Sequence, residues 1–209
     1  MASNPWENFP PDIYETHMGL ADVGQLQMLS RITKEQLGAF EISSIMILGI
    51  AGGNGLEHVD PAKFDLIVGI DINSDFLTIC ASRYEDFGEK LLLLNLDFND
   101  PGTILPYADL VIANLFLEYV DTDAFAEKVA ASGAKHVSVV YQENRAESFV
   151  STSPYAGNFA EIGKLHKDVD GRALTLAMKK FGYGTGESKS YELPNGKGFI
   201  RLDFSRMPL

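Results

Sequence analysis

The chain has 209 residues, a formal net charge of −12 and a hydrophobic fraction of 45%. This length and composition are typical of one globular domain with a sizeable core. The negative charge disfavours nucleic acid and anionic membranes as partners, because both attract cationic surfaces, so we expect a small-molecule partner. No apolar run approaches the ~20 residues that span a bilayer, and residues 1–12 lack the features of a secretory signal. We therefore expect a cytoplasmic protein; the oligomeric state stays open.

A helix is predicted before the first strand. Val23, Leu26, Leu29 and Ile32 recur at a spacing of three and form one apolar stripe, which ends near Gly38.

From residue 45 onward, short apolar runs alternate with helix-like segments. The runs cover residues 45–48, 66–70, 91–96, 110–113 and 137–140. Runs that are apolar on both faces are typical of central strands in a parallel sheet. Helices are predicted at residues 74–84 and 121–131, with Ser74 and Asp121 as N-caps. This alternation predicts an α/β sheet with right-handed crossovers.

The C-terminal part follows a different pattern. A helix is predicted over residues 172–181, followed by strands at 189–193 and 198–204. The Asn195-Gly196 pair between them predicts a hairpin, because both residues tolerate a positive φ. The expected fold is a doubly wound, Rossmann-like, seven-stranded sheet, mostly parallel with an antiparallel C-terminal hairpin and helices on both faces. Residues 144–170 show little periodicity and are expected to form a lid or an insertion.

A glycine-rich loop, LGIAGGNG at residues 48–55, directly follows the first predicted strand. Glycines there let the backbone pass close to a ligand. A short helix expected at residues 55–59 would present free N–H groups to an electron-rich ligand. The same loop could instead be a plain tight turn.

Two aspartates follow the second and third strands. Asp71 could accept both hydroxyls of a ribose or cap the next helix, although Ser74 is better placed for capping. Asp97 could accept from an adenine amino group with Phe98 against the ring, or it could simply close the turn at residues 99–101. Because strands one to three end at one crevice, both aspartates are candidates for one ligand site.

The fourth strand ends at Asn114, whose amide or backbone could face the reacting end of a cofactor. Glu118 and Tyr119 follow within the same crevice. They could line a substrate pocket, or they could be ordinary surface and core residues at the start of a helix.

In this order and spacing, the four segments resemble the class I S-adenosylmethionine-dependent methyltransferases over roughly residues 45–205. The resemblance implies S-adenosylmethionine as cofactor and a methyl acceptor that is a small molecule. The cofactor-binding residues that we predict are Gly49, Ala51, Gly52, Gly53, Asn54, Gly55, Asp71, Ile72, Asp97, Phe98, Asn114 and Leu115.

The sequence departs from the family pattern twice. Gly49 stands where the family has the acidic residue that holds the methionine ammonium of the cofactor, and Ala51 replaces the first glycine. Alanine there costs little if its φ is negative. The ammonium would need another partner, such as backbone carbonyls, Asn114 or Glu118.

The resemblance also implies how one domain, residues 1–209, divides. Residues 1–44 would form a helical lid, 45–143 the cofactor-binding half, and 144–209 a substrate-side insertion, helix and hairpin. The predicted substrate pocket consists of Tyr14, His17, Glu118, Tyr119 and Tyr155. His17 is a candidate general base or simply a surface histidine.

No catalytic residue is assigned, because methyl transfer from a sulfonium mainly requires alignment and exclusion of water. The histidines and Cys80 show no metal-ligand spacing, so no metal is predicted, and Cys80 is interpreted as a core thiol. Two other functions remain open: a nicotinamide-dependent oxidoreductase, and an S-adenosylmethionine-binding protein without turnover.

Overall fold

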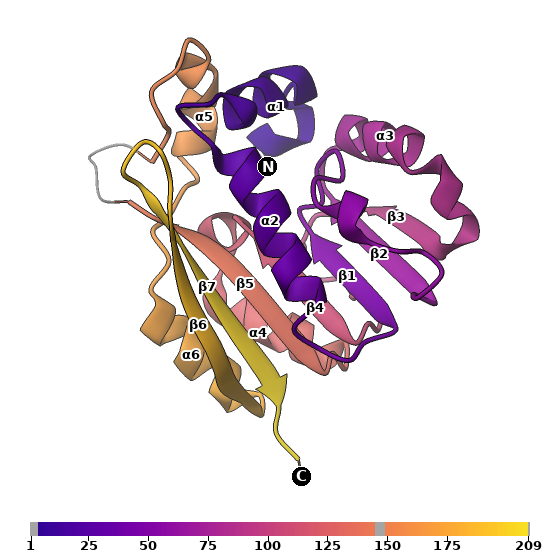
Figure 1. Ribbon diagram of the computed structural model, residues 1–209. Coiled ribbons are helices and arrows are strands. Elements are labelled where there is room, and N and C mark those ends of the chain that lie inside the picture. Colours follow the sequence, from indigo (N-terminus) through magenta and orange to yellow (C-terminus); the bar gives the residue numbers. More distant parts are fainter. Residues whose placement is uncertain (1–3, 145–148, 209) are drawn as a thin grey trace.

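A computed structural model describes residues 4–144 and 149–208 (Figure 1). Seven strands form one sheet in the order β3-β2-β1-β4-β5-β7-β6. They are β1 (Ser44–Leu48), β2 (Leu66–Asp71), β3 (Leu91–Asn95), β4 (Leu110–Asn114), β5 (His136–Glu143), β6 (Tyr183–Glu192) and β7 (Gly198–Arg206). β1 to β5 pair in parallel, whereas β7 pairs antiparallel with β5 and β6. The predicted fold class is confirmed.

The apolar runs occupy the middle of the sheet because both of its faces are covered. Met46 of β1 lies between Val68 of β2 and Val111 of β4, and all three side chains are fully buried. Every residue of β1 is buried. A strand can be apolar throughout only where neither face meets water, as the sequence pattern predicted.

Helices cover both faces of the sheet (Figure 1). Leu77 of α3 packs on one face near β1 and β2, and Ile32 of α2 packs near β5 and β7. Phe125 of α4 and Met178 of α6 pack together on the opposite face. The helices are α1 (Pro11–Gly19), α2 (Gln25–Leu37), α3 (Ser74–Arg83), α4 (Thr122–Ala131), α5 (Ala160–Gly163) and α6 (Gly171–Lys180).

Two helix caps show where local sequence reasoning succeeds and fails. Asp121 caps α4 as predicted, since its side chain accepts from the Ala124 N–H at 2.9 Å. The predicted Ser74 cap is wrong. Asn73 is the N-cap of α3, and its Oδ1 accepts from the Asp75 N–H at 2.9 Å. Asn73 and Ser74 are both residue types that cap helices, so the sequence alone did not separate them.

The C-terminal hairpin is confirmed, but β6 is longer than predicted. It begins at Tyr183, and its pairing with β7 shifts register between Thr185 and Ser188. A register shift breaks the alternation of polar and apolar residues that identifies a strand in the sequence. Gly196 in the turn has φ 78°, as a hairpin of this type requires.

The N-terminal segment lies over the edge at which the parallel strands end, close to α5 (Figure 1). It begins with a short 3-10 helix, Pro5–Asn8, followed by α1. Asn73, directly beyond β2, donates from Nδ2 to the carbonyls of Trp6 at 2.9 Å and Phe9 at 3.0 Å. These two bonds fasten the segment to the end of β2.

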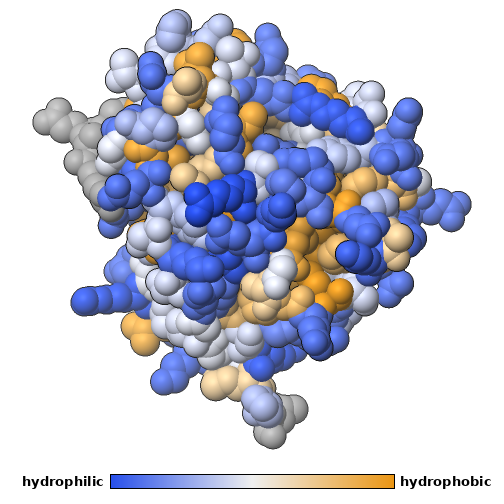
Figure 2. All heavy atoms as spheres, viewed as in Figure 1, coloured by the Kyte–Doolittle hydropathy of each residue, from blue (hydrophilic) through white to orange (hydrophobic). Residues whose placement is uncertain are grey.

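Hydrophilic side chains cover most of the face shown in Figure 2. Within residues 4–144 and 149–208, no helix has both the length and the apolar character needed to cross a bilayer. Cys80 is buried and free, and burial raises the pKa of its thiol to about 11, which confirms that it is a core thiol.

Candidate functional site

A cleft lies over the carboxyl ends of the parallel strands; we name it the strand-end cleft. Its walls include the predicted residues Gly49, Ala51, Asp71, Ile72, Asp97, Phe98, Asn114 and Leu115. The structure therefore brings these residues together from four loops that are distant in the sequence.

The rest of the glycine loop faces away from the strand-end cleft. The predicted residues that do not line it are Gly52, Gly53, Asn54 and Gly55. A Cβ on Gly53 would lie 2.6 Å from Cε2 of Tyr84, and one on Gly55 would lie 2.7 Å from Cγ2 of Thr33. These glycines let the loop pack closely against the end of α3 and against α2.

The expected helix at residues 55–59 is shorter than predicted, a 3-10 turn at Leu56–His58. The Gly55 N–H donates to Oε2 of Glu57 at 2.7 Å, so it is not free for a ligand.

Asp71 ties the glycine loop to the end of β2. Its Oδ2 accepts from the Ala51 N–H and its Oδ1 from the Asn73 N–H, both at 2.9 Å. Burial raises the pKa of this carboxyl, while the backbone N–H groups of Asn73 and Ala51 counteract the rise. The carboxyl is thus held in one orientation at the wall of the strand-end cleft.

Backbone strain is concentrated at the strand-end cleft. Among the described residues, the non-glycine residues with positive φ are Ala51 at 47° and Leu115 at 53°, and both line it. The assumption that Ala51 has a negative φ is therefore wrong, because the loop needs a left-handed residue where it meets Asp71. Such strain is typical of functional sites.

The structure gives a physical reason for the absence of an acid at Gly49. Its φ is 68°, and a Cβ there would lie 3.0 Å from Cδ2 of Phe116. An acidic side chain would need both a strained backbone and displacement of this ring.

Asn114 lines the strand-end cleft, but other side chains hold its amide. Its Oδ1 accepts from Gln36 Nε2 at 2.9 Å, and its Nδ2 donates to Gln36 Oε1 at 3.0 Å and to Thr33 Oγ1 at 3.2 Å. Gln36 also donates to Ser138 Oγ at 2.9 Å. This network links the end of β4 to α2 and fixes the direction of the Asn114 backbone.

Asp97 fulfils both of its predicted placements. It lines the strand-end cleft, and its Oδ1 accepts from the Asn99 N–H at 2.8 Å, which closes the turn. The ring of Phe98 is mostly in the core, edge-on to Phe116 with centroids 5.2 Å apart.

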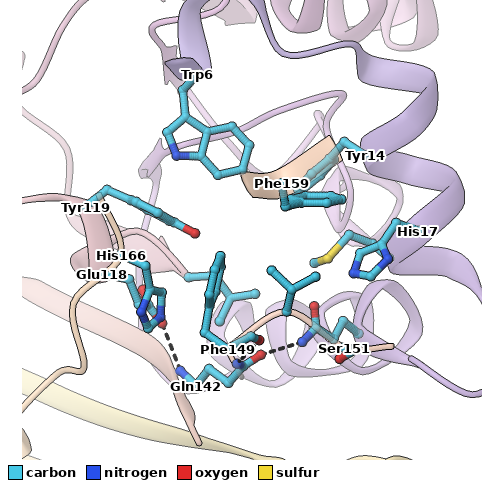
Figure 3. A pocket seen from close by; sticks show the side chains of 14 residues that line it. Trp6, Tyr14, His17, Glu118, Tyr119, Gln142, Phe149, Ser151, Phe159 and His166 are labelled. Carbon is cyan, nitrogen blue, oxygen red and sulfur yellow. Dashed lines mark hydrogen bonds between the residues drawn. The ribbon is translucent and has the colours of Figure 1, made fainter. Parts of the chain in front are cut away.

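A second cavity, with about 500 Å³ of space, adjoins the first; we name it the aromatic pocket (Figure 3). Trp6, Tyr14, Leu115 and Tyr119 line both cavities. In Figure 3 the hydroxyl of Tyr119 points toward the centre of the space between the rings. The two cavities are therefore adjacent and share a wall.

Four of the five predicted substrate-pocket residues line the aromatic pocket: Tyr14, His17, Glu118 and Tyr119. Tyr155 does not. It precedes the 3-10 helix Ala156–Phe159, and that helix presents Phe159 to the pocket instead.

His17 is not a surface histidine. Its side chain is buried, with Nδ1 2.7 Å from Oγ of Ser153. Burial and the charge of Lys197 lower its pKa, so the imidazole is neutral at pH 7.

Glu118 is the most unusual group of the aromatic pocket. It is 2% exposed; its Oε1 accepts from the Gln142 N–H at 2.9 Å, and its Oε2 has no hydrogen-bond partner. Burial raises the pKa of its carboxyl to about 7.

Solved structures with the same architecture are methyltransferases in most cases. The magnesium protoporphyrin IX methyltransferase of Synechocystis PCC 6803, with bound SAH, is 13% identical, with a TM-score of 0.71 over 97% of this chain and 96% of that chain. The N-methyltransferase NodS of Bradyrhizobium japonicum WM9, in complex with S-adenosyl-L-homocysteine, is 12% identical, with a TM-score of 0.66 over 99% and 100%. This chain has the class I methyltransferase fold.

Sequence comparison adds no closer relationship, because no protein-family model and no curated protein sequence matches the chain. The [4+2]-cyclase SpnF is also similar in structure to this chain, at 11% identity and a TM-score of 0.63 over 86% of this chain and 80% of that chain. The fold alone therefore does not decide the reaction, and the function has to be inferred from the site.

Sequence reasoning missed several residues of the candidate site. The aromatic pocket also includes Trp6, Gln25, Gln142, Phe149, Phe159 and His166. A signal for Trp6 was present: Asn4 and Glu7 form a capping box with Pro5 at the first helical position, and such a pattern predicts a helix start. Residues 149–166 carry no comparable signal.

In the part of the chain that the structure describes, no group of three or more His, Cys, Asp or Glu side chains is placed to hold a metal ion.

Proposed function

We propose that this chain is an S-adenosylmethionine-dependent methyltransferase that acts on a small molecule. The observation that carries the proposal is the adjacency of the strand-end cleft and the aromatic pocket, which share a wall formed by Trp6, Tyr14, Leu115 and Tyr119. A cofactor in the first cavity and an acceptor in the second would meet at this shared wall. The net charge of −12 also favours a small molecule over nucleic acid or a membrane.

The residues of the strand-end cleft fit the cofactor. Asp71 offers a fixed carboxyl to the ribose hydroxyls, and Asp97 offers one to the adenine amino group. Ala51 and Leu115, whose backbones are left-handed, line the cleft where the methionine part would lie. When bound, the cofactor supplies a methyl group on a sulfonium, which is already a good leaving group.

The chain's own residues would mainly orient the reactants and exclude water. Trp6 and Tyr14 lie over the junction of the two cavities, with ring centroids 5.9 Å apart. Holding two reactants in line replaces a bimolecular encounter with an effectively unimolecular one. A general base is needed only if the acceptor arrives protonated.

Calorimetry with S-adenosylhomocysteine tests the proposal. We expect binding to the wild-type chain and a loss of about 1–3 kcal/mol in Asp71→Ala, because charge-assisted hydrogen bonds to the ribose disappear. Asp75→Ala, which removes an exposed carboxyl from α3, is the matched control and should keep the wild-type affinity. Binding of NADH but not of S-adenosylhomocysteine would instead support an oxidoreductase.

A second candidate, a binding protein without turnover, is favoured by the absent acid at Gly49. Tight S-adenosylhomocysteine binding without methylation of any compound in a broad acceptor screen would support it.

A further inference from the structure

The aromatic pocket contains a buried carboxyl that the chain itself does not satisfy. Glu118 is 2% exposed, and its Oε2 has no hydrogen-bond partner. An unsatisfied buried polar atom costs ~1–3 kcal/mol, and more when it is charged. Such an atom in a native fold calls for an explanation, and a ligand is a direct one.

No cation of the described chain pairs with this carboxyl. The lining of the aromatic pocket contains no lysine or arginine among residues 4–144 and 149–208. The charged residue that acts on the Glu118 carboxyl is Asp168, and its negative charge raises the pKa of Glu118 further. Lys197 acts on His17 and His166 but is not among the charges that act on Glu118. An anionic acceptor beside Glu118 would therefore be repelled by it, and a neutral one would leave the carboxylate without a counter-charge.

Charged residues near this pocket include Asp168 and Lys197 besides Glu118. Asp168 adds to the effect of burial in raising the pKa of Glu118, and Lys197 adds to the effect of burial in lowering the pKa of His17 and His166. Burial lowers the pKa of Lys197 itself to about 8. Burial raises the pKa of the phenols of Tyr14, Tyr119 and Tyr141, which therefore stay neutral. Among the residues that line the pocket, Glu118 is the acid that changes charge near neutral pH.

Aromatic rings surround the space beside the carboxyl (Figure 3). Rings of Trp6, Tyr14, Tyr119, Phe149 and Phe159 line the pocket. Trp6 and Tyr119 meet edge-to-face with centroids 5.2 Å apart. The face of an aromatic ring attracts an ammonium group by about 2 kcal/mol when the cation is desolvated. Rings plus one unpaired carboxylate form a site for an alkylated ammonium.

We propose that the methyl acceptor is an alkylamine whose ammonium group is held in the aromatic pocket by Glu118 and the surrounding rings. This inference rests on the function proposed above and names its substrate class. Glu118 lines the aromatic pocket and not the strand-end cleft, so it is assigned to the acceptor rather than to the ammonium of the cofactor.

The transfer step balances with this carboxyl as base. The acceptor ammonium gives its proton to Glu118 Oε2, which frees the nitrogen lone pair. The nitrogen then forms a bond to the methyl carbon while the carbon–sulfur bond breaks and the sulfur keeps the electron pair. The products are a methylated ammonium and a thioether, and Glu118 returns its proton to solvent when the pocket opens.

Binding can be measured without turnover, because Trp6 is the chain's single tryptophan and lines the pocket. The probe pair is (2-hydroxyethyl)trimethylammonium and its uncharged carbon analogue, 3,3-dimethylbutan-1-ol. Both are titrated at pH 8.5 and constant ionic strength, with S-adenosylhomocysteine present, and tryptophan fluorescence is recorded. The expected result is at least tenfold tighter binding of the cation.

Two variants test whether the Glu118 carboxyl causes the preference for the cationic probe. In Glu118→Gln, the two probes should bind with nearly equal affinity. Glu127→Gln removes an equal charge from the exposed face of α4 and should keep the preference, which controls for the general attraction of cations by a chain of charge −12. If Glu118→Gln does not fold, the pH dependence decides: the preference for the cation should fall severalfold from pH 8.5 to pH 6.5 as the carboxyl is protonated. It should fall equally in Lys197→Met, which removes the neighbouring cation that gains charge over the same range.

Equal binding of the two probes, or a preference unchanged in Glu118→Gln, would overturn the inference. So would weaker S-adenosylhomocysteine binding in Glu118→Gln with the preference retained, because the carboxyl would then serve the cofactor. Each of these results leaves the proposed function standing. Failure of the wild type to bind S-adenosylhomocysteine would overturn the proposed function itself.

Discussion

The strand-end cleft and the aromatic pocket share a wall but are built in different ways. The strand-end cleft depends on backbone conformation at the ends of β1 and β4, where Gly49, Ala51 and Leu115 are left-handed, and it also includes side chains such as those of Asp71 and Asp97. The aromatic pocket is formed by large side chains from the N-terminal segment, the turn after β4 and residues 149–166. A site built by backbone requires particular conformations, whereas a site built by side chains can change its ligand by substitution.

This difference explains how such a fold can keep one cofactor and exchange acceptors. In the strand-end cleft the geometry follows from the sheet, since parallel strands deliver their loops to one edge. In the aromatic pocket the chemistry depends on single residues such as Glu118, whose charge no other described residue balances. Single substitutions can test each half of this contrast.

The largest effect is expected where the glycine loop touches α2. Gly55→Ala would place a Cβ 2.7 Å from Cγ2 of Thr33 at a φ of 98°. We expect a loss of about 2–5 kcal/mol in the free energy of unfolding, from backbone strain and overpacking together. Urea denaturation measures it.

Gly182→Ala is the matched control for this prediction. Gly182 also has a positive φ, 85°, but nothing lies within 4 Å of the point that an added Cβ would occupy. It should cost only the strain, about 1–2 kcal/mol. Equal losses in the two variants would show that the close packing of the loop is unimportant.

The next effect concerns the hydrogen bonds with which Asn73 fastens the N-terminal segment to the end of β2. Asn73→Ala removes the N-cap of α3 and the bonds to the carbonyls of Trp6 and Phe9. We expect about 2–3 kcal/mol of lost stability, and faster proteolysis of the N-terminal segment.

Asp121→Ala, which removes only the cap of α4, should cost about 1 kcal/mol and leave that proteolysis unchanged. If the N-terminal segment is cleaved at the same rate in both variants, Asn73 does not fasten it.

A third prediction isolates the buried carboxyl of the aromatic pocket. The pKa of Glu118 is raised from its ordinary 4.5 to about 7, so folding favours the protonated form. That stability is fully present below the ordinary pKa and is lost as the pH rises through about 7. Between pH 5.5 and pH 8 the wild type should lose ~2 kcal/mol relative to Glu118→Gln.

Unfolding free energies of both chains at the two pH values measure this difference, and all other groups cancel in the comparison. Parallel pH curves would mean that Glu118 is not the unpaired buried acid described above.

The contrast between the strand-end cleft and the aromatic pocket also explains which features the sequence could predict. The apolar runs of β1 to β5, the Asn-Gly hairpin and the placement of Asp71 follow from local patterns, and the sheet brings their ends together. The sign of φ at Ala51 did not follow, because a hydrogen bond to Asp71 holds that backbone in place. Phe149, Phe159 and His166 did not follow either, since only the tertiary path of an aperiodic segment brings them to the pocket.

The smallest effect has an unusual sign. Ala51→Gly should stabilise the chain, by a few tenths of a kcal/mol to about 1, because glycine adopts a φ of 47° without a Cβ penalty. The larger entropy of glycine in the unfolded chain offsets part of this gain. Ala173→Gly on the exposed face of α6 is the control and should instead destabilise by about 1 kcal/mol. Because the left-handed backbone of Ala51 lines the strand-end cleft and is held by Asp71, the stabilised variant should bind S-adenosylhomocysteine no more tightly than the wild type. A tighter complex would mean that the left-handed conformation of Ala51 destabilises the chain without contributing to ligand binding. The shape of the cleft would then depend on Asp71 alone.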